Sequence, residues 1–218
     1  MKNFLLASLL PLLAFFQLRD CEGGSQQNTA YEAPSADELA KLETAYFASG
    51  CFWCVEAIYE SVKGVKEVVS GYSGGFKNNP TYEQVGRKTT GHAETVAVYY
   101  DPTVVSFKTL VDVFYGSQDP TTYGQRPDFG EPYRSIIFYE NDEEKATAEA
   151  AKEAVQKNYS KPVVTEIKKF EKFWPAENYH QNYEKLNPNQ PYVRSVSVPR
   201  LNRFKEKFPE LLKEEEKL

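Results

Sequence analysis

The sequence predicts a domain of the α/β or α+β class, in which helices cover a β-sheet. Short runs rich in β-branched and aromatic residues alternate along the chain with stretches of helical periodicity. Gly, Pro, Asp and Ser stand between these runs, where turns are expected. Residues 42–218 are long enough to form one domain with its own core, and no internal repeat interrupts them. The pattern does not determine the order of the strands.

The first 20 residues have the pattern of a secretory signal. Lys2 precedes an apolar run from Phe4 to Phe16, which is shorter than the roughly 20 residues of a membrane-spanning helix. We therefore expect residues 1–20 to be a signal segment and the protein to be exported, to the periplasm or the cell envelope. A buried N-terminal helix is the alternative. Cys21 faintly resembles the acylated cysteine of bacterial lipoproteins, although charged residues precede it where such signals have small ones.

Residues 21–41 are rich in Gly, Ser, Gln, Asn and acidic residues and contain almost no large apolar side chain. Such a segment cannot bury enough surface to fold, so a flexible linker is predicted. The formal net charge of -5 disfavours a general nucleic-acid binder. We expect a monomer that binds no nucleic acid.

The first predicted strand leads into a short cysteine motif. Glu43 to Ser49 contains two aromatic residues and is followed by Gly50, which suits a strand and its closing turn. The next apolar residues recur at helical spacing, and Gly64 stands where a helix commonly ends. These apolar residues are Val55, Ile58, Tyr59 and Val62. The pattern places Cys51 at the start of a helix.

A thiol at a helix start has unusual chemistry. The first helical amides lack partners within the helix and the macrodipole is positive there, so we expect the pKa of Cys51 to fall. Cys54 stands one turn along the same face, close enough to form a disulfide with Cys51. A short-loop disulfide constrains the unfolded chain little, which favours redox work over a structural role. A structural staple or a pair of buried cysteines is the alternative.

The remaining elements follow in turn. Strands are predicted where β-branched and aromatic residues cluster, at Val65–Tyr72, Glu94–Tyr100, Arg134–Tyr139 and Val163–Ile167. Helices are predicted from the Ser106 cap to about Tyr115, over Asp142–Tyr159, and from about Leu201 to Glu216. Ser117 to Pro132 is predicted to be a loop of functional length. The last helix is expected to pack its apolar residues against the domain: Leu201, Phe204, Phe208 and Leu211.

Glu94 lies at the start of a predicted strand, where two placements are open. Strand alternation puts it on the same side as Val96 and Val98. If that side is the apolar one, burial raises the pKa of Glu94 and makes it a proton donor near neutrality. If Thr95 and Ala97 face inward instead, Glu94 is an ordinary solvated residue.

Six blocks in this order resemble the type A peptide methionine sulfoxide reductases, over about Thr44 to Leu186. The blocks are Gly50 to Trp53, Gly71 to Gly75, Asn79 to Tyr82, Gly91 to Glu94, Asp128 to Ser135 and Pro175 to Gln181. The resemblance implies a two-layer sandwich with a mixed β-sheet flanked by helices. It also implies reduction of the S epimer of methionine sulfoxide in proteins, in repair of oxidative damage; we expect free methionine sulfoxide to be a substrate too.

The resemblance assigns roles by motif. Cys51 matches the nucleophile and Glu94 the acid, while Phe52 and Trp53 match the wall that holds the substrate methyl group. Three further residues match the groups around the sulfoxide oxygen: the phenols Tyr82 and Tyr133, and the carboxylate Asp128 that supports them. Attack by Cys51 with proton donation by Glu94 would leave a sulfenic acid on Cys51.

The resemblance also implies how the enzyme is recycled. Many relatives place a resolving cysteine in a C-terminal tail, whereas this chain has none after Cys54. Cys54 replaces a glycine of other members, as in the branch that resolves within CxxC, so we expect a Cys51–Cys54 disulfide. An external thioredoxin-like dithiol would reduce it, and no bound cofactor is expected. Direct regeneration by a small thiol is the alternative.

Two other classes of protein share parts of this pattern. A thioredoxin-like disulfide exchanger also uses CxxC at a helix start, but it leaves the Gly91 to Glu94 block without a role. A zinc site built from Cys51, Cys54, His92 and His180 would have ligands spread over most of the domain, unlike usual zinc spacings. His92 and His180 are more simply interpreted as hydrogen-bonded core residues, and no metal site is expected.

Overall fold

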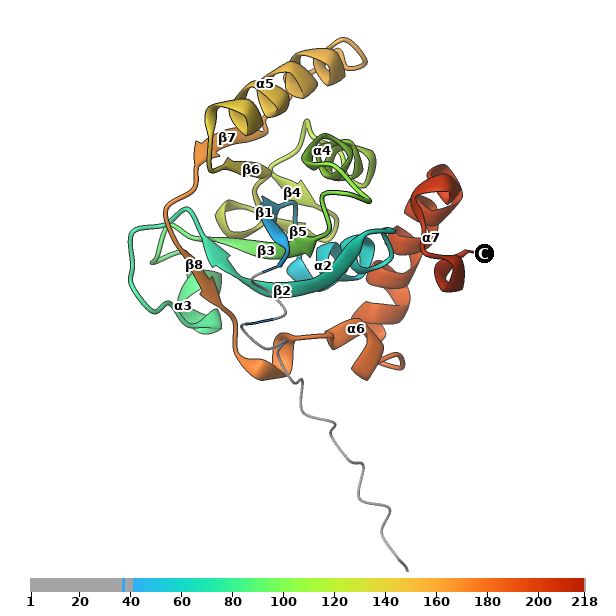
Figure 1. Cartoon of the computed structure of the whole chain (residues 1–218). Coiled ribbons are helices and arrows are strands. Elements are labelled where there is room, and N and C mark those ends of the chain that lie inside the picture. Colours follow the sequence, from blue (N-terminus) through green and yellow to red (C-terminus); the bar gives the residue numbers. More distant parts are fainter. Residues whose placement is uncertain (1–36, 38–40, 218) are drawn as a thin grey trace, which may run out of the picture.

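The strands pair into one mixed sheet of six. In the computed structural model, which describes residue 37 and residues 41–217, the strand order is β7-β6-β1-β3-β2-β8 (Figure 1). All neighbours are antiparallel except β6 and β7. The strands are β1 (Glu43–Ala48), β2 (Val65–Ser73), β3 (Ala93–Tyr100), β6 (Ile136–Tyr139), β7 (Glu166–Lys169) and β8 (Phe173–Pro175). The predicted mixed sheet flanked by helices is confirmed.

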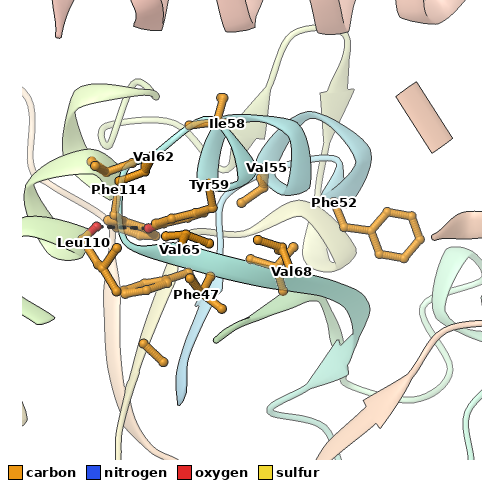
Figure 2. Close-up of a cluster of buried hydrophobic side chains, with 14 of the residues drawn as sticks. Phe47, Phe52, Val55, Ile58, Tyr59, Val62, Val65, Val68, Leu110 and Phe114 are labelled. Atoms are coloured by element: carbon orange, nitrogen blue, oxygen red, sulfur yellow. Dashed lines mark hydrogen bonds between the residues drawn. The ribbon is translucent and has the colours of Figure 1, made fainter. Parts of the chain in front are cut away.

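Three helices cover one face of the sheet. Helix α2 (Phe52–Glu60) packs on β2 and β3, and α5 (Asp142–Gln156) packs against α4 (Phe107–Gly116), β6 and β7. Figure 2 shows the core where α2 and α4 meet β1 and β2; the Tyr59 hydroxyl donates to the carbonyl oxygen of Leu110 at 3.0 Å within it. The opposite face has a smaller apolar cluster, covered by the stacked rings of Tyr46 and Phe170.

The elements at the centre of the sheet agree with the sequence prediction, and those at its edge differ. The strand predicted at Val163–Ile167 begins only at Glu166, because the amides of Val163 and Val164 donate to Gln156 and Pro120 instead of to a neighbouring strand. The predicted Ser117–Pro132 loop contains a small hairpin, β4 (Gly124–Gln125) with β5 (Asp128–Phe129), followed by the 3₁₀ turn η1 (Glu131–Tyr133).

Several short elements were not predicted. Helix α3 (Tyr82–Gly86) begins at a capping box made by Thr81 and Gln84, and β8 adds an edge strand beside β2. The turn η2 (Asn178–His180) and helix α6 (Tyr183–Leu186) then connect β8 to the C-terminal segment.

The C-terminal helix differs from its prediction at both ends. It begins at residue 191, passes through a π-helical turn, η3 (Val193–Ser197), continues as α7 (Val198–Lys207) and ends before Pro209, which cannot continue a helix. Two 3₁₀ turns follow, η4 (Pro209–Leu211) and η5 (Glu214–Glu216). The predicted apolar residues do pack against the core, with Phe204 fully buried.

Several predictions concern residues outside those that the structure describes. They are the signal segment 1–20, the proposed anchor Cys21, and the linker 21–41 apart from residues 37 and 41. Within the described part of the chain, none of the helices combines the length and the apolar character needed to cross a bilayer.

Candidate active site

The site begins at a tight turn between β1 and α2. Gly50 adopts φ +89°, a conformation that L side chains rarely take, and a Cβ there would lie 3.3 Å from Nη1 of Arg200. This turn places Cys51 at the N-cap of α2, as predicted. The carbonyl oxygen of Cys51 accepts the Val55 amide at 3.3 Å, the first bond of the helix.

Cys54 lies one helical turn from Cys51, and both are buried free thiols within hydrogen-bonding reach of one another. Cys54 is 1% exposed, and its Sγ lies 2.9 Å from Oγ of Ser197 and 3.9 Å from the Tyr192 hydroxyl. The predicted proximity of the two sulfurs is confirmed.

Glu94 approaches the same helix start from the sheet. Its carboxyl group is 3% exposed, and Oε2 accepts the backbone amide of Phe52 at 3.0 Å. Burial raises the pKa of Glu94 to about 8, although the Phe52 amide opposes the shift. The buried placement that the strand pattern left open is therefore the observed one, and Glu94 holds a proton at neutral pH.

The predicted lowering of the Cys51 pKa is wrong for this structure. The helix amide that was expected to stabilise its thiolate is occupied by Glu94. Burial raises the pKa of Cys51, and the neighbouring Cys54 raises it further. The pKa of Cys54 is lowered instead, chiefly by the hydrogen bond from Cys51 and also by the Arg200 charge and the hydroxyls of Ser197 and Tyr192. Of the two thiols, Cys54 is therefore the one whose ionisation the surroundings favour.

Aromatic rings form a wall beside Cys51. The Phe52 ring lies 6.2 Å from the ring of Tyr82 and 5.0 Å from that of His180, measured between centroids. Trp53 stacks on Tyr183 with centroids 3.7 Å apart. An apolar wall of this kind suits a methyl group next to a polar reacting centre.

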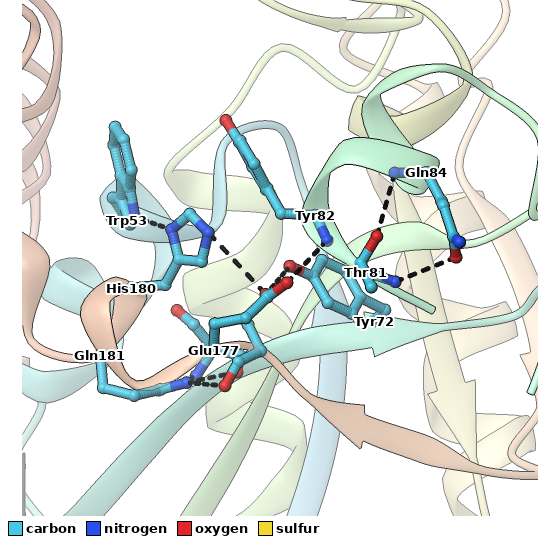
Figure 3. Close-up of polar contacts among 10 residues, drawn as sticks. Trp53, Tyr72, Thr81, Tyr82, Gln84, Glu177, His180 and Gln181 are labelled. Carbon is cyan, nitrogen blue, oxygen red and sulfur yellow. Dashed lines mark hydrogen bonds and ion pairs between the residues drawn. The ribbon is translucent and has the colours of Figure 1, made fainter. Parts of the chain in front are cut away.

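A chain of polar contacts fixes this wall (Figure 3). Trp53 Nε1 donates to Nδ1 of His180 at 3.1 Å, and His180 Nε2 lies 4.0 Å from Oε2 of Glu177. The two Glu177 oxygens accept the backbone amide of Tyr82 at 3.0 Å and the Tyr72 hydroxyl at 2.9 Å. Burial lowers the pKa of His180 to about 4, so its ring is neutral. Its role as a hydrogen-bonded buried residue agrees with the prediction.

Two buried polar residues hold residues 177–183 in place. Gln181 bonds both the amide and the carbonyl of Ser70 on β2. Glu56 on α2 accepts from the Ser70 hydroxyl at 3.0 Å and from the Asn182 amide at 2.8 Å. Residues 177–183 are thereby fixed to the helix that carries both cysteines.

The predicted oxygen-binding residues lie around the same point. The charges that act on both Tyr82 and Tyr133 include Glu94, Cys51 and Asp128, and neither phenol hydroxyl bonds another group in the described chain. Both are therefore free to donate to a substrate oxygen. The Asp128 carboxylate accepts its hydrogen bond from Tyr192, not from Tyr82 or Tyr133.

Three residues of the C-terminal segment belong to the site although the sequence does not predict them: Tyr192, Ser197 and Arg200. They approach Cys54 although they lie more than 130 residues from it. No local motif marks them, because the tail has an ordinary amphipathic pattern. The only local signal is that Ser197 carries a hydroxyl at a helical position whose neighbours four residues away on either side are apolar.

The four residues considered for a zinc site do not meet. His92 is held by the backbone of the β2–α3 connection, with Nδ1 accepting the Gly75 amide at 3.1 Å and Nε2 2.8 Å from the carbonyl oxygen of Lys77. Among the residues that the structure describes, no three His, Cys, Asp or Glu side chains are placed to share a metal ion.

Comparisons with known proteins agree with one another. The family model described as "Peptide methionine sulfoxide reductase" matches residues 43–212. A protein of Haloquadratum walsbyi named peptide methionine sulfoxide reductase MsrA is 47% identical over 171 residues, which are 78% of this chain and 98% of that protein. A protein of the same name from Polynucleobacter asymbioticus is 46% identical over 180 residues, 80% of this chain and 93% of the relative.

Two solved structures are also similar. Reduced Mxr1 from Saccharomyces cerevisiae superposes with a TM-score of 0.65 at 30% identity, covering 75% of this chain and 92% of that one. Methionine sulfoxide reductase A of Corynebacterium diphtheriae gives a TM-score of 0.62 at 34% identity, covering 69% of this chain and 77% of its own.

Proposed function

This chain belongs to the peptide methionine sulfoxide reductase family and is an oxidoreductase that reduces methionine (S)-sulfoxide to methionine; we propose that Cys51 is its nucleophile and Glu94 its acid. The observation that supports these roles most directly is the shared helix start. Glu94 bonds the amide of the residue next to Cys51, which sets a proton donor beside the thiol.

The substrate side chain would enter between the aromatic wall and the two phenols. Its methyl group would contact Phe52 and Trp53, and the hydroxyls of Tyr82 and Tyr133 would donate to its oxygen. In this arrangement the substrate sulfur would lie over Cys51 and its oxygen would point towards Glu94. Donors aimed at the oxygen lower the barrier because negative charge develops there as the S–O bond breaks.

Proton positions in the resting site fit the reaction. The Cys51 proton passes to the Cys54 thiolate, and the Cys51 thiolate attacks the sulfoxide while Glu94 protonates the oxygen. Methionine leaves, and Cys51 holds the oxygen as a sulfenic acid. Cys51 has then accepted the oxygen and supplied both electrons of the reduction.

Cys54 resolves the sulfenic acid in the next step. The Cys54 proton, which came from Cys51, passes to the Glu94 carboxylate. The Cys54 sulfur then attacks Cys51, and Glu94 protonates the departing hydroxide to give water. The S–S bond forms as the S–O bond breaks. The two protons present at the start, on Cys51 and Glu94, are the two that leave in water.

The disulfide must then be reduced from outside the chain. A thioredoxin-like dithiol can supply the two electrons, so the cycle uses no bound cofactor. Oxidised proteins, peptides and free methionine sulfoxide would all be substrates, because the groups above contact only the side chain. All of these groups come from one chain, which supports catalysis by a monomer.

Turnover of the two sulfoxide epimers by four enzymes tests the proposal. Cys51→Ser should release no methionine, Glu94→Gln should release it slowly, and Cys54→Ser should release one equivalent and stop. Wild type should act on the S epimer and yield a Cys51–Cys54 link in a peptide map. Methionine release by Cys51→Ser, or a link that omits Cys54, would contradict the proposed roles. Small-thiol regeneration predicts instead that Cys54→Ser turns over in dithiothreitol and glutathione as fast as wild type.

We also propose that the protein is exported, because Phe4 to Phe16 is apolar and follows a lysine. Cell fractionation of the full chain and of a Cys21→Ser variant tests it. Export with release of the Cys21→Ser variant from membranes supports lipid anchoring, and a wholly cytosolic product contradicts both hypotheses.

A further inference from the structure

The C-terminal helix places one hydroxyl on the resolving sulfur. Ser197 is 0% exposed, and its Oγ lies 2.9 Å from Sγ of Cys54. Ser195, two residues earlier, behaves as serine usually does in a helix, with its hydroxyl donating to the Pro191 carbonyl at 2.7 Å. Ser197 makes no such bond to its own helix in the described chain. Its hydroxyl faces the Cys54 sulfur and also the Glu184 carboxyl, whose pKa it acts to lower.

A local irregularity of the helix accompanies this contact. Val193 to Ser197 form a π-helical turn, and Ser197 is the last residue of that turn. π-turns rotate the residues around them relative to a regular helix and are frequent at functional sites. Ser197 faces inward, while Ser195 is exposed.

Arg200 fixes the helix at this position. Its Nε donates to the carbonyl of Ser117 and its Nη2 to the carbonyl of Ser49, both at 3.0 Å. Ser49 directly precedes the Gly50-Cys51 turn, so the helix is tied to the same turn that positions the nucleophile. Arg200 forms no ion pair with a carboxylate in residues 41–217, and its positive charge acts on Cys54.

We propose that Ser197 is a positioning residue for resolution: its hydroxyl donates to the Cys54 sulfur and holds that sulfur towards Cys51 for attack on the sulfenic acid. The inference rests on the proposed function of the cysteine pair. A hydroxyl that donates to a thiolate stabilises the charged form, and a fixed sulfur loses less entropy when the disulfide closes. In this chain the C-terminal segment thus supports a resolving cysteine that it does not itself carry.

The groups that face Cys54 act on its ionisation in both directions, and the hydrogen bond from Cys51 has the largest effect. Arg200 and the hydroxyls of Tyr192 and Ser197 favour the thiolate. Glu94 on β3 and Glu184 on α6 would oppose it if ionised. Burial raises the pKa of Glu94 to about 8 and of Glu184 to about 7, so Glu94 keeps its proton at neutral pH, whereas Glu184 loses its own as the pH rises through 7.

The test is a single turnover with one equivalent of a sulfoxide peptide. Ser197→Ala should still release one methionine per enzyme, since Cys51 and Glu94 are intact. Disulfide closure should slow by about tenfold or more, the loss expected for one charge-assisted hydrogen bond. The sulfenic acid should become trappable by dimedone, and the pH profile of closure should move to higher pH.

Ser195→Ala is the matched control, because it removes a hydroxyl from the same turn without touching a sulfur. It should close the disulfide as wild type does. Ser197→Thr keeps the hydroxyl and should retain faster closure than Ser197→Ala. Closure by Ser197→Ala at the wild-type rate and with the wild-type pH profile would overturn the inference. If wild type itself forms no Cys51–Cys54 disulfide, the proposed function fails instead.

A second measurement needs no change at residue 197. Thiolate absorbance of the resting enzyme near neutral pH should be present in wild type and lost in Cys54→Ser. Absorbance that survives in Cys54→Ser and disappears in Cys51→Ser would place the charge on the wrong sulfur and contradict the inference.

Discussion

Two residues from separate elements, Cys51 and Glu94, meet at one helix start and compete for its amide. Glu94 takes the Phe52 amide, and the thiol beside it stays protonated. A sequence-based argument can locate a helix N-terminus, but it cannot say which of two nearby acidic groups will occupy it. The consequence is that charge and nucleophilicity are divided between Cys54 and Cys51 until substrate arrives.

Reduction should depend on pH through the Glu94 proton. The pKa of Glu94 is raised to about 8, so the chemical step should slow as the pH rises through that value. Glu94→Gln should lack this alkaline limb and react about 100-fold or more slowly near neutrality, as expected for a lost general acid. Single-turnover rates between pH 6 and 10 measure both effects. An unchanged alkaline limb in Glu94→Gln would assign the proton to another group.

The same residue should make the fold less stable at higher pH. The unfolded carboxyl titrates near its ordinary value of about 4.3, and the folded one near 8. Between these values the folded state binds the proton and the unfolded state does not, so stability falls as the pH rises through this window. Glu94→Gln removes that cost and can still accept the Phe52 amide, so it should be more stable by up to a few kcal/mol above pH 8.

Urea unfolding of wild type and Glu94→Gln across pH 4 to 9 measures the difference. The exposed Glu153→Gln on α5 serves as control and should follow wild type throughout. A Glu94→Gln enzyme that is less stable than wild type at high pH would show that the carboxyl is not desolvated.

At the scale of elements, the turn before α2 sets the position of the nucleophile. Gly50 has φ +89°, and a Cβ there would lie 3.0 Å from Cγ of Gln125. Gly50→Ala should therefore destabilise the fold by about 1–3 kcal/mol and reduce the rate of methionine release, because Cys51 follows directly. Gly86→Ala on α3 is the control: no atom lies within 4 Å of the added Cβ, so stability and rate should be retained. Equal behaviour of the two variants would contradict this account.

The elements with strong local signals could be predicted from the sequence. Helix α4 starts at its expected cap, with the Thr109 amide donating to Ser106 Oγ, and β2 and β3 differ from their predicted ranges by one residue. The local sequence pattern mispredicted a strand boundary where a tertiary contact takes the backbone hydrogen bond. The amide of Val164 donates to Pro120 from a separate loop, so β7 starts later than its apolar run suggests.

The site was predictable to the same extent. The residues in motif blocks, such as Cys51, Glu94 and Tyr82, do surround one point. The direction of the Cys51 pKa shift and the roles of Ser197 and Arg200 could not be predicted, because both depend on packing between distant segments. A tail with ordinary amphipathic spacing gives no sign that its polar residues face a sulfur.

In the whole molecule, the C-terminal segment packs against the elements that carry the site. Figure 1 shows α7 beside α2, and the two helices are in contact. Arg200 is the polar link, since its guanidinium bridges the end of β1 at Ser49 and the end of α4 at Ser117. Three segments distant in sequence therefore depend on one planar side chain that is 7% exposed.

Arg200→Lys should separate this geometry from the charge. Lysine keeps the positive charge but cannot donate to two carbonyls in fixed directions, so at least one buried carbonyl loses its partner. We expect a loss of about 1–3 kcal/mol in the free energy of unfolding. Urea denaturation measures it, with Arg203→Lys as control, because Arg203 lies on the same helix with an exposed side chain. If the two variants unfold alike, Arg200 does not join the three segments, and the tail packs through its apolar residues alone.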